Sequence, residues 1–336
     1  MASSEPPSEA NSSDTSSEGV DWWIRLERSI SLLATMATLA IAGFTWTSIT
    51  QVNSEQAITR EGQITDRYTA AVNNLGNSSQ DVRLGGIYAL QRLMQDSPRD
   101  QPAVIDVISA YVRSHAQQHE AGPKRLTNDV AAALLVLKTR DASHDGAGHV
   151  DLTGAALYGA HLGRSHLQGA ILQSVDLQNA DLRDAVLHDA NLSGAELQRA
   201  NLNGANLTHA DLSTADLHSA ELTSADLTGA SLRDAHMSYA NLRSTNLHSA
   251  KLSSADLTSA KLSDADLSNA DLSIANLSRA YLKGADLTGA DLTAANLTSA
   301  GVSAQQLLTA QLSEYTQLPS NLANDPQLRK AMRQGS

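Results

Sequence analysis

The sequence is rich in side chains that could do chemistry, with 11 His, 36 Asp and Glu, and many Ser and Thr. A His beside Ser and Asp could support nucleophilic catalysis, and clustered His and carboxylates could bind a metal ion. Cysteine is absent, which excludes disulfides, thiolate zinc sites and cysteine nucleophiles. A GxSxG motif and a glycine-rich phosphate loop are also missing, since Gly85 and Gly86 fall inside a predicted helix. Any joint action of these side chains therefore depends on the elements that position them.

Most of these side chains stand in a five-residue repeat that covers 150–304. The stretch divides into 31 consecutive pentapeptides without an insertion, and the third residue of each is Leu except at Met237 and Val302. Two residues before the Leu stands Ala, and a mostly polar residue lies between them. The exceptions at the Ala position are Val150, Ser165, Val175 and Thr245.

Neither regular backbone structure has a period of five. On an α-helix each Leu would lie about 140° from the last, and on a strand successive Leu residues would alternate between faces. Within one pentapeptide, however, Ala and Leu are two residues apart and share a face. The chain must therefore turn the same way after every unit, which predicts a solenoid with Ala and Leu inside and the polar positions outside.

The stretch "ADLTGADLTAANLTSA" (285–300) resembles the pentapeptide-repeat family, whose consensus is A-(D/N)-L-x-x. The resemblance implies a right-handed quadrilateral β-helix in which four pentapeptides form one coil, so that residues 20 apart stack. Together with 61–96, the repeats resemble the membrane-anchored actinobacterial branch of the family, for which the resemblance implies no established activity. The inner leucines predicted for the core are Leu152, Leu177, Leu197, Leu217, Leu222, Leu227, Leu257 and Leu287.

A transmembrane helix is predicted near the N-terminus. No residue of 29–54 is charged, and 30–49, "ISLLATMATLAIAGFTWTSI", is long enough to span a bilayer. A cleaved signal peptide and a buried core helix are the alternatives. Lys and Arg on the two sides of the segment balance, and the lack of both in 1–20 favours the β-helix on the cytoplasmic side. We therefore predict a single-pass membrane protein.

These patterns divide the chain into five parts. We predict a mainly β protein whose β-helix is preceded by the transmembrane helix and a small α-helical unit, with helices at 65–75, 80–96, 101–116 and 127–140. The C-terminal cap could mediate a homodimer. The predicted parts are a disordered acidic tail (1–20), the transmembrane helix and its flanks (21–54), a small helical domain (55–141), the β-helix (142–304) and a cap with a short helix (305–336).

The repeat places its histidines outside. No histidine of the repeats stacks directly on another histidine in the implied coil. The residues concerned are His161, His166, His188, His209, His218, His236 and His248. His188 and His248 share a column but lie three coils apart, about 14 Å, which is too far for one metal ion. We therefore predict no catalytic residue, no metal and no cofactor, and a protein that is not an enzyme.

The surface charge is negative, with a net charge of −12 for the chain. This disfavours direct nucleic-acid binding, which needs clustered Lys and Arg. We predict a scaffold for an unknown protein partner. The alternative is a mimic of duplex DNA that modulates gyrase or topoisomerase, as the resemblance to gyrase-protecting members implies. Both functions would use two acid-rich columns, whose carboxylates are Asp176, Glu196, Asp216 and Asp256 in one and Asp226, Asp266 and Asp286 in the other.

Overall fold

The computed structural model describes residues 60–117, 125–146 and 148–334. The chain divides into two compact units, Met1–Thr65 and Asp66–Ser336. Of the first unit, residues 60–65 are described, and they are helical. The second contains helices α2 to α6 and the repeats. The predicted acidic tail (1–20) and transmembrane segment (21–54) lie outside the described residues.

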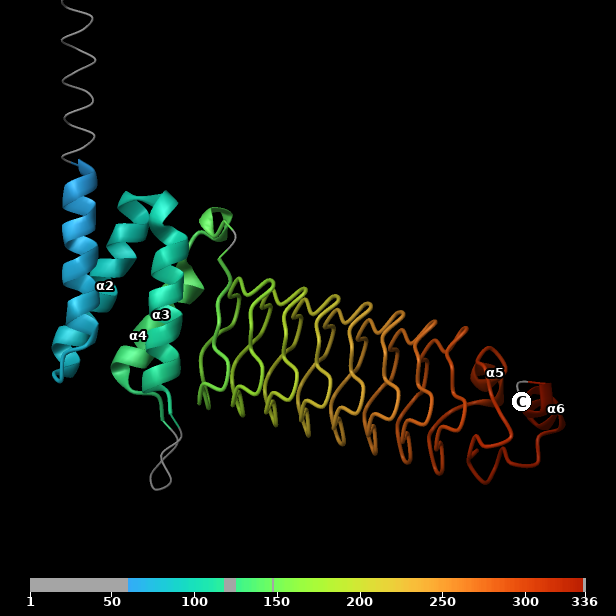
Figure 1. Ribbon diagram of the computed structural model, residues 1–336. Coiled ribbons are helices and arrows are strands. Elements are labelled where there is room, and N and C mark those ends of the chain that lie inside the picture. The colour runs from blue at the N-terminus through green and yellow to red at the C-terminus, as the bar shows by residue number, and fades with distance from the viewer. Residues whose placement is uncertain (1–59, 118–124, 147, 335–336) are drawn as a thin grey trace, which may run out of the picture. The chain divides into compact units, whose positions relative to one another are not determined.

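Helices make up the part of the second unit that precedes the repeats (Figure 1). Helix α4 packs against both α2 and α3, and the core between them contains Ile87, Leu90 and Ile105. Pro102 in the first turn of α3 suits a position whose N–H has no helical partner. The observed elements agree closely with the predicted helices. They are a helical stretch at 60–75, α2 (Gln80–Asp96), α3 (Gln101–His115), α4 (Asn128–Thr139) and 3₁₀ turns at Pro98–Asp100 and Ala142–His144.

The repeats form a stack of coils (Figure 1). The residues that precede the leucines pair in parallel bridges with residues 20 positions away, starting with Asp151 and Ile171. Because a bridge recurs every five residues, each coil has four sides and contains four pentapeptides. The ladder continues as far as Gln317, where the pairing with Asn296 spans one extra residue.

The prediction of a mainly β protein needs correction. Within the described residues these pairings are isolated bridges of one residue each, and the regular secondary structure is helical. The reason lies in the length of a side. After each Leu the chain makes a two-residue turn whose second residue has positive φ, as in Ser219 (φ 57). The extended part of a side is therefore too short for a strand.

The core of the coils consists of the repeated Leu and Ala. All eight leucines that were predicted to point inward are at most 1% exposed. At one end the carbonyl oxygen of Ala116, which follows α3, accepts from the N–H of Ala156 at 2.7 Å. At the other end the short α5 (Ala304–Leu307) and α6 (Pro326–Gln334) bury Leu307 and Leu328. Part of the edge of each terminal coil is thus covered by a helical segment, which protects that part from further pairing.

The prediction of a transmembrane helix is corrected as well. None of the helices in the part of the chain that the structure describes combines the length and the apolar character needed to cross a membrane. The segment 30–49, on which the prediction was based, lies outside that part. Six Ser and Thr residues make this segment less apolar than typical membrane spans. The single-pass membrane location that followed from it has no support in the structure.

Candidate functional site

Each pentapeptide satisfies its backbone donors in one fixed way. In 215–219, four of the five N–H groups donate to backbone carbonyl oxygens at 2.7–3.1 Å, those of Leu212, Ala195, His236 and Ser238. The fifth belongs to His218 and donates to Oδ1 of Asp216 at 2.9 Å. The outward Asp therefore completes the hydrogen bonding of the turn that follows it, as Asx turns do.

Six of the seven predicted surface carboxylates have this local role. Each accepts the N–H two residues further on at 2.9–3.1 Å, and they are Asp176, Asp216, Asp226, Asp256, Asp266 and Asp286. Asn206 and Asn246 do the same with an amide oxygen. Glu196, whose side chain is one methylene longer, accepts instead from Nε2 of Gln178. The Asp or Asn of the consensus is thus explained by the turn, whatever else binds there.

The bridges bring the predicted acid columns together. Asp176, Glu196 and Asp216 pair in succession, and His236 and Asp256 continue this row. The second row runs through Asp226, Asn246, Asp266 and Asp286. Neighbours in a row lie in adjacent coils, about 4.8 Å apart. The use of these rows by a partner stays a prediction.

Charge differs among the four faces of the coils. We number the faces by their first bridging residue: Asp151 (first), Ala156 (second), His161 (third) and His166 (fourth), each face recurring every 20 residues. The fourth face from 166 to 290 contains no Lys or Arg. The third face contains five of the nine cations of the repeats, which are Arg164, Arg183, Arg243, Lys261 and Lys283.

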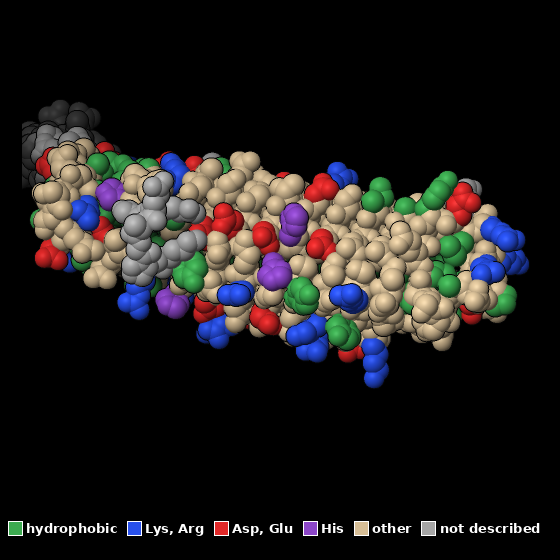
Figure 2. Space-filling model, turned by 90° about the horizontal axis from the view of Figure 1, so that it is seen from below, with side chains coloured by type: hydrophobic (Ala, Val, Ile, Leu, Met, Phe, Trp, Pro, Cys, Tyr) green, Lys and Arg blue, Asp and Glu red, His purple; other side chains and the backbone are tan. Residues whose placement is uncertain are grey.

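On the third face, the cations of the first coils lie near carboxylates, whereas those of the later coils do not. Arg183 pairs with Asp181 at 2.7 Å, and Arg164 approaches Asp184 at 3.5 Å. The hydrogen bond from Arg183 lowers the pKa of Asp181 to about 2. Figure 2 shows Lys and Arg side chains gathering along one edge of the repeats. Further along, Arg243, Lys261 and Lys283 have no carboxylate of the described residues within 4.0 Å, so their charges are free to meet a partner.

The histidines do not converge. His218 bonds to Ser238 at 2.9 Å and His248 bonds to Ser268 at 2.8 Å, in each case one coil further on. Across the ranges 60–117, 125–146 and 148–334, no group of three or more His, Cys, Asp or Glu residues is placed to hold a metal ion. These side chains act as surface hydrogen-bonding groups.

A buried carboxylate joins the helices of the second unit. Asp129 on α4 is 1% exposed and accepts from Arg83 of α2 at 2.6–2.8 Å and from the Tyr111 hydroxyl of α3 at 2.6 Å. Burial alone would raise the pKa of Asp129, but hydrogen bonds from Thr127, Tyr111, Arg83 and Gln80 outweigh it and lower the pKa. Burial and the bond to Asp129 raise the pKa of Tyr111 to about 12. Because every member is paired, this cluster is a structural link between helices.

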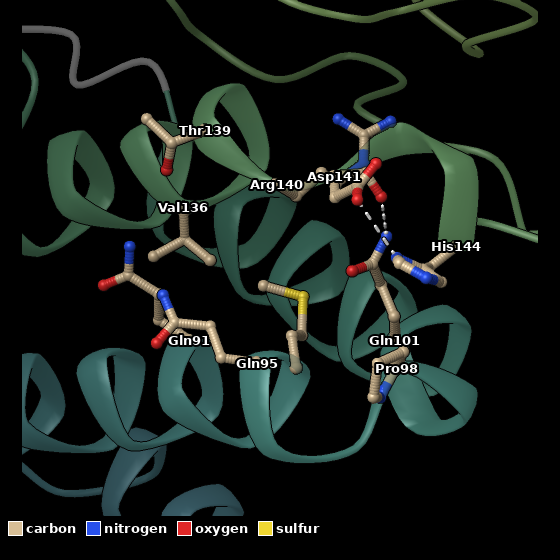
Figure 3. A pocket seen from close by; sticks show the side chains of 10 residues that line it. Gln91, Gln95, Pro98, Gln101, Val136, Thr139, Arg140, Asp141 and His144 are labelled. Carbon is tan, nitrogen blue, oxygen red and sulfur yellow. Dashed lines mark hydrogen bonds and ion pairs between the residues drawn. The ribbon is translucent and has the colours of Figure 1, made fainter.

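A pocket of ≈ 370 Å³ lies between α2 and α4 (Figure 3). Gln91 and Gln95 line it from α2, and Val136 and Thr139 line it from α4. At its edge Arg140 binds Asp145 at 2.7 Å, and Gln101 donates to the same carboxylate at 2.7 Å. Its buried charged groups are thus already neutralised within the chain.

A larger hollow of ≈ 550 Å³ lies near the C-terminal cap. Gly301 ends the row of the third face beside Tyr281, and Lys283 is the charged residue of the lining. Gln306 of α5 donates from the lining to the carbonyl oxygens of Leu282 and Ala285 at 2.7 and 2.8 Å. The hollow is therefore a built part of the cap.

Comparison with protein families gives a clear match. The family described as "Pentapeptide repeats (8 copies)" matches residues 151–189, 180–218, 190–229, 225–264 and 260–298. A pentapeptide-repeat structure, HetL from the cyanobacterium Nostoc sp. strain PCC 7120, is 35% identical over 47% of this chain and 83% of its own. The chain belongs to the pentapeptide-repeat family.

Two further solved structures match parts of the chain. The protein alr5209 from Nostoc PCC 7120 is 37% identical over 36% of this chain and 80% of its own, with a TM-score of 0.27. The plasmid-mediated fluoroquinolone resistance protein QnrB1 is 20% identical over 54% of this chain and 93% of its own, with a TM-score of 0.36. The TM-score for HetL, which is involved in heterocyst differentiation regulation, is 0.24. Among curated proteins, none matches the sequence.

One feature of this pentapeptide-repeat protein was missed from the sequence. The predicted surface contained only carboxylates, yet the third face carries free cations and the exposed Tyr281 (59% exposed), and Tyr239 (55%) lies at its edge with the second face. The signal was present, because Lys and Arg can be sorted by the same 20-residue spacing as the acids.

Proposed function

We propose that this pentapeptide-repeat protein is a non-catalytic scaffold that holds a protein partner on the outer faces of its coils. The observation that carries the proposal is the fixed 20-residue pairing, which places outward side chains in straight rows on a stiff backbone. Rigid presentation reduces the entropy that binding must overcome. The inner side chains and the backbone donors of the repeats are already used by the fold.

The proposal can be tested with a photo-crosslinking amino acid placed at outward positions of the full-length chain in cells. Positions 171, 216, 281 and 226 sample the first, second, third and fourth faces. A scaffold gives a reproducible crosslinked partner from one face and not from the others. The absence of any crosslinked protein from every face would refute it.

The gyrase-modulating alternative is a second candidate because one face has the charge it needs. The fourth face carries Asp189, Asp226, Asp266 and Asp286 without a cation. A row of carboxylates at regular spacing can imitate a phosphate backbone. Inhibition of gyrase supercoiling by the protein, reduced by Asp226→Asn with Asp266→Asn, would support this candidate. Unchanged supercoiling at saturating protein would remove it.

A further inference from the structure

One stretch of the third face carries exposed cations that the protein does not neutralise. Three of them stand in successive coils, and a fourth lies at the edge shared with the second face. None has a carboxylate of the described chain within 4.0 Å. These cations are Arg243, Lys261, Lys283 and, at the edge, Arg279. With the two tyrosines described next, we call this surface the basic patch.

Two tyrosines accompany these cations. Tyr281 stands in the row of the third face, directly after Lys261, and is 59% exposed. Tyr239 lies at the same edge as Arg279 and is 55% exposed. Tyr and Arg are enriched where protein partners bind, because they offer a large contact area together with polar groups. Large exposed aromatics beside free charges therefore mark this stretch as a contact surface.

The basic patch ends at the ≈ 550 Å³ hollow. Gly301 follows Tyr281 in the row, and the absence of a side chain there leaves the space open. Lys283, Ser303 and Asn321 lie around it. The Ser303 hydroxyl already donates to Oε1 of Gln306 at 2.9 Å, so a carboxylate would be met by the Lys283 ammonium with the Asn321 amide beside it.

We propose that the basic patch binds an acidic segment of a protein partner, with one carboxylate seated in the hollow against Lys283. The inference rests on the proposed scaffold function and names its surface and the chemistry of its partner. Charge complementarity carries it, because these cations are free on a chain whose net charge is −12. That same net charge repels a long polyanion beyond the few coils of the patch, which favours a protein segment over nucleic acid.

The test measures the affinity of the full-length chain for a fluorescein-labelled oligoglutamate peptide by fluorescence anisotropy. The test variant is Arg243→Ser with Lys261→Asn, because Ser263 and Asn241 already occupy these columns. The first face offers a matched control, Arg233→Ser with Lys251→Asn, with the same residue types at the same repeat positions. We expect the test variant to bind about tenfold more weakly, the effect of losing two ion pairs, and the control to change less than about twofold.

Three further variants examine the details of the basic patch. Gly301→Gln places a side chain at the hollow, and the Cβ itself meets no atom closer than 3.7 Å. We expect this variant to weaken binding of the peptide several-fold, and we expect the same of Lys283→Ser. Asp264→Asn removes a carboxylate from the same face and should tighten binding.

Each contrary outcome has a distinct meaning. If the test and control variants weaken peptide binding equally, only the net charge of the protein matters and the inference is overturned. Tighter binding of an oligothymidine strand than of the peptide would overturn it as well. A partner that crosslinks only through another face would refute binding at the basic patch but would be consistent with the proposed scaffold function. A chain that crosslinks to nothing would remove the scaffold itself.

Discussion

The backbone N–H of Thr228 donates to Oδ1 of Asp226 at 3.0 Å, and the Thr228 hydroxyl donates to the same oxygen at 2.6 Å. One carboxylate oxygen thus serves the turn, and only the other remains for a partner. The same arrangement recurs along the coils, for example between Thr258 and Asp256. The many Asp residues of the repeat are therefore explained in large part by the hydrogen bonds that its turns require.

This relationship predicts which changes at Asp226 matter. Asp226→Ala should lower the free energy of unfolding by about 1 kcal/mol, because the Thr228 N–H loses its acceptor. Asp226→Asn keeps an acceptor oxygen and should cost less than about half as much. Urea denaturation of both variants provides the measurement. Equal losses would mean that the charge, and not the acceptor, stabilises the turn.

Ser165 and Thr245 occupy equivalent inner positions but differ in hydrogen bonding. Thr245 donates to the carbonyl oxygen of Leu222 at 2.8 Å, as its buried hydroxyl requires, whereas the buried Ser165 hydroxyl has no hydrogen-bond partner among the described residues. We expect Ser165→Ala to stabilise the protein by about 1 kcal/mol and Thr245→Ala to destabilise it by a similar amount. Thermal unfolding of the two variants measures both changes in stability. A destabilising Ser165→Ala would contradict the assignment.

Leu217 is fully buried, and its equivalents in the adjacent coils are Leu197 and Met237. Leu217→Ala should cost about 2–5 kcal/mol, because the coils above and below cannot collapse into the gap. Leu217→Met is the control, since Met237 already fills the next position, and it should cost less than about 1.5 kcal/mol. Guanidinium denaturation compares the two. An alanine variant as stable as the methionine variant would show a core that readily relaxes.

Ile274 has φ 62 and is 65% exposed, an unfavourable conformation for a β-branched residue. Ile274→Asn should raise the free energy of unfolding by about 1 kcal/mol, because Asn tolerates this region. Asn269 has φ 57 at the same repeat position. The reverse change, Asn269→Ile, should destabilise by a similar amount, and denaturation midpoints report both. Effects of the same sign would be inconsistent with backbone strain.

The pKa of Asp181 is lowered to about 2 by the hydrogen bond from Arg183. A carboxyl whose pKa is lower in the folded than in the unfolded state stabilises the fold above the unfolded pKa of about 3.9. This contribution should be lost as the pH falls from about 4 to about 2. NMR titration of Asp181 measures it, and Arg183→Ser should return the pKa toward the ordinary 3.8. An unchanged titration in that variant would exclude Arg183 as the cause.

Much of the fold could be predicted because the repeat is local. The spacing of Leu and Ala determines which residues point inward, and the helical periodicity of 80–96 and 101–116 leads directly to α2 and α3. The assignment of a mainly β protein was wrong because periodicity does not reveal how short each extended side is. The hydrophobic segment at 30–49 led to a membrane prediction that the structure does not support.

The sequence by itself determined the solenoid and its inner and outer positions, since these follow from five consecutive residues at a time, and the four-sided coil was implied by the resemblance to the family. Only the tertiary structure decided the surface. Arg164 approaches Asp184 of the next coil at 3.5 Å, whereas Lys283 is left free beside Gly301 and a hollow near the cap. These differences depend on which side chains meet across coils and on how the chain closes its last coil. Such contacts join residues 20 or more positions apart, and local propensity carries no information about them.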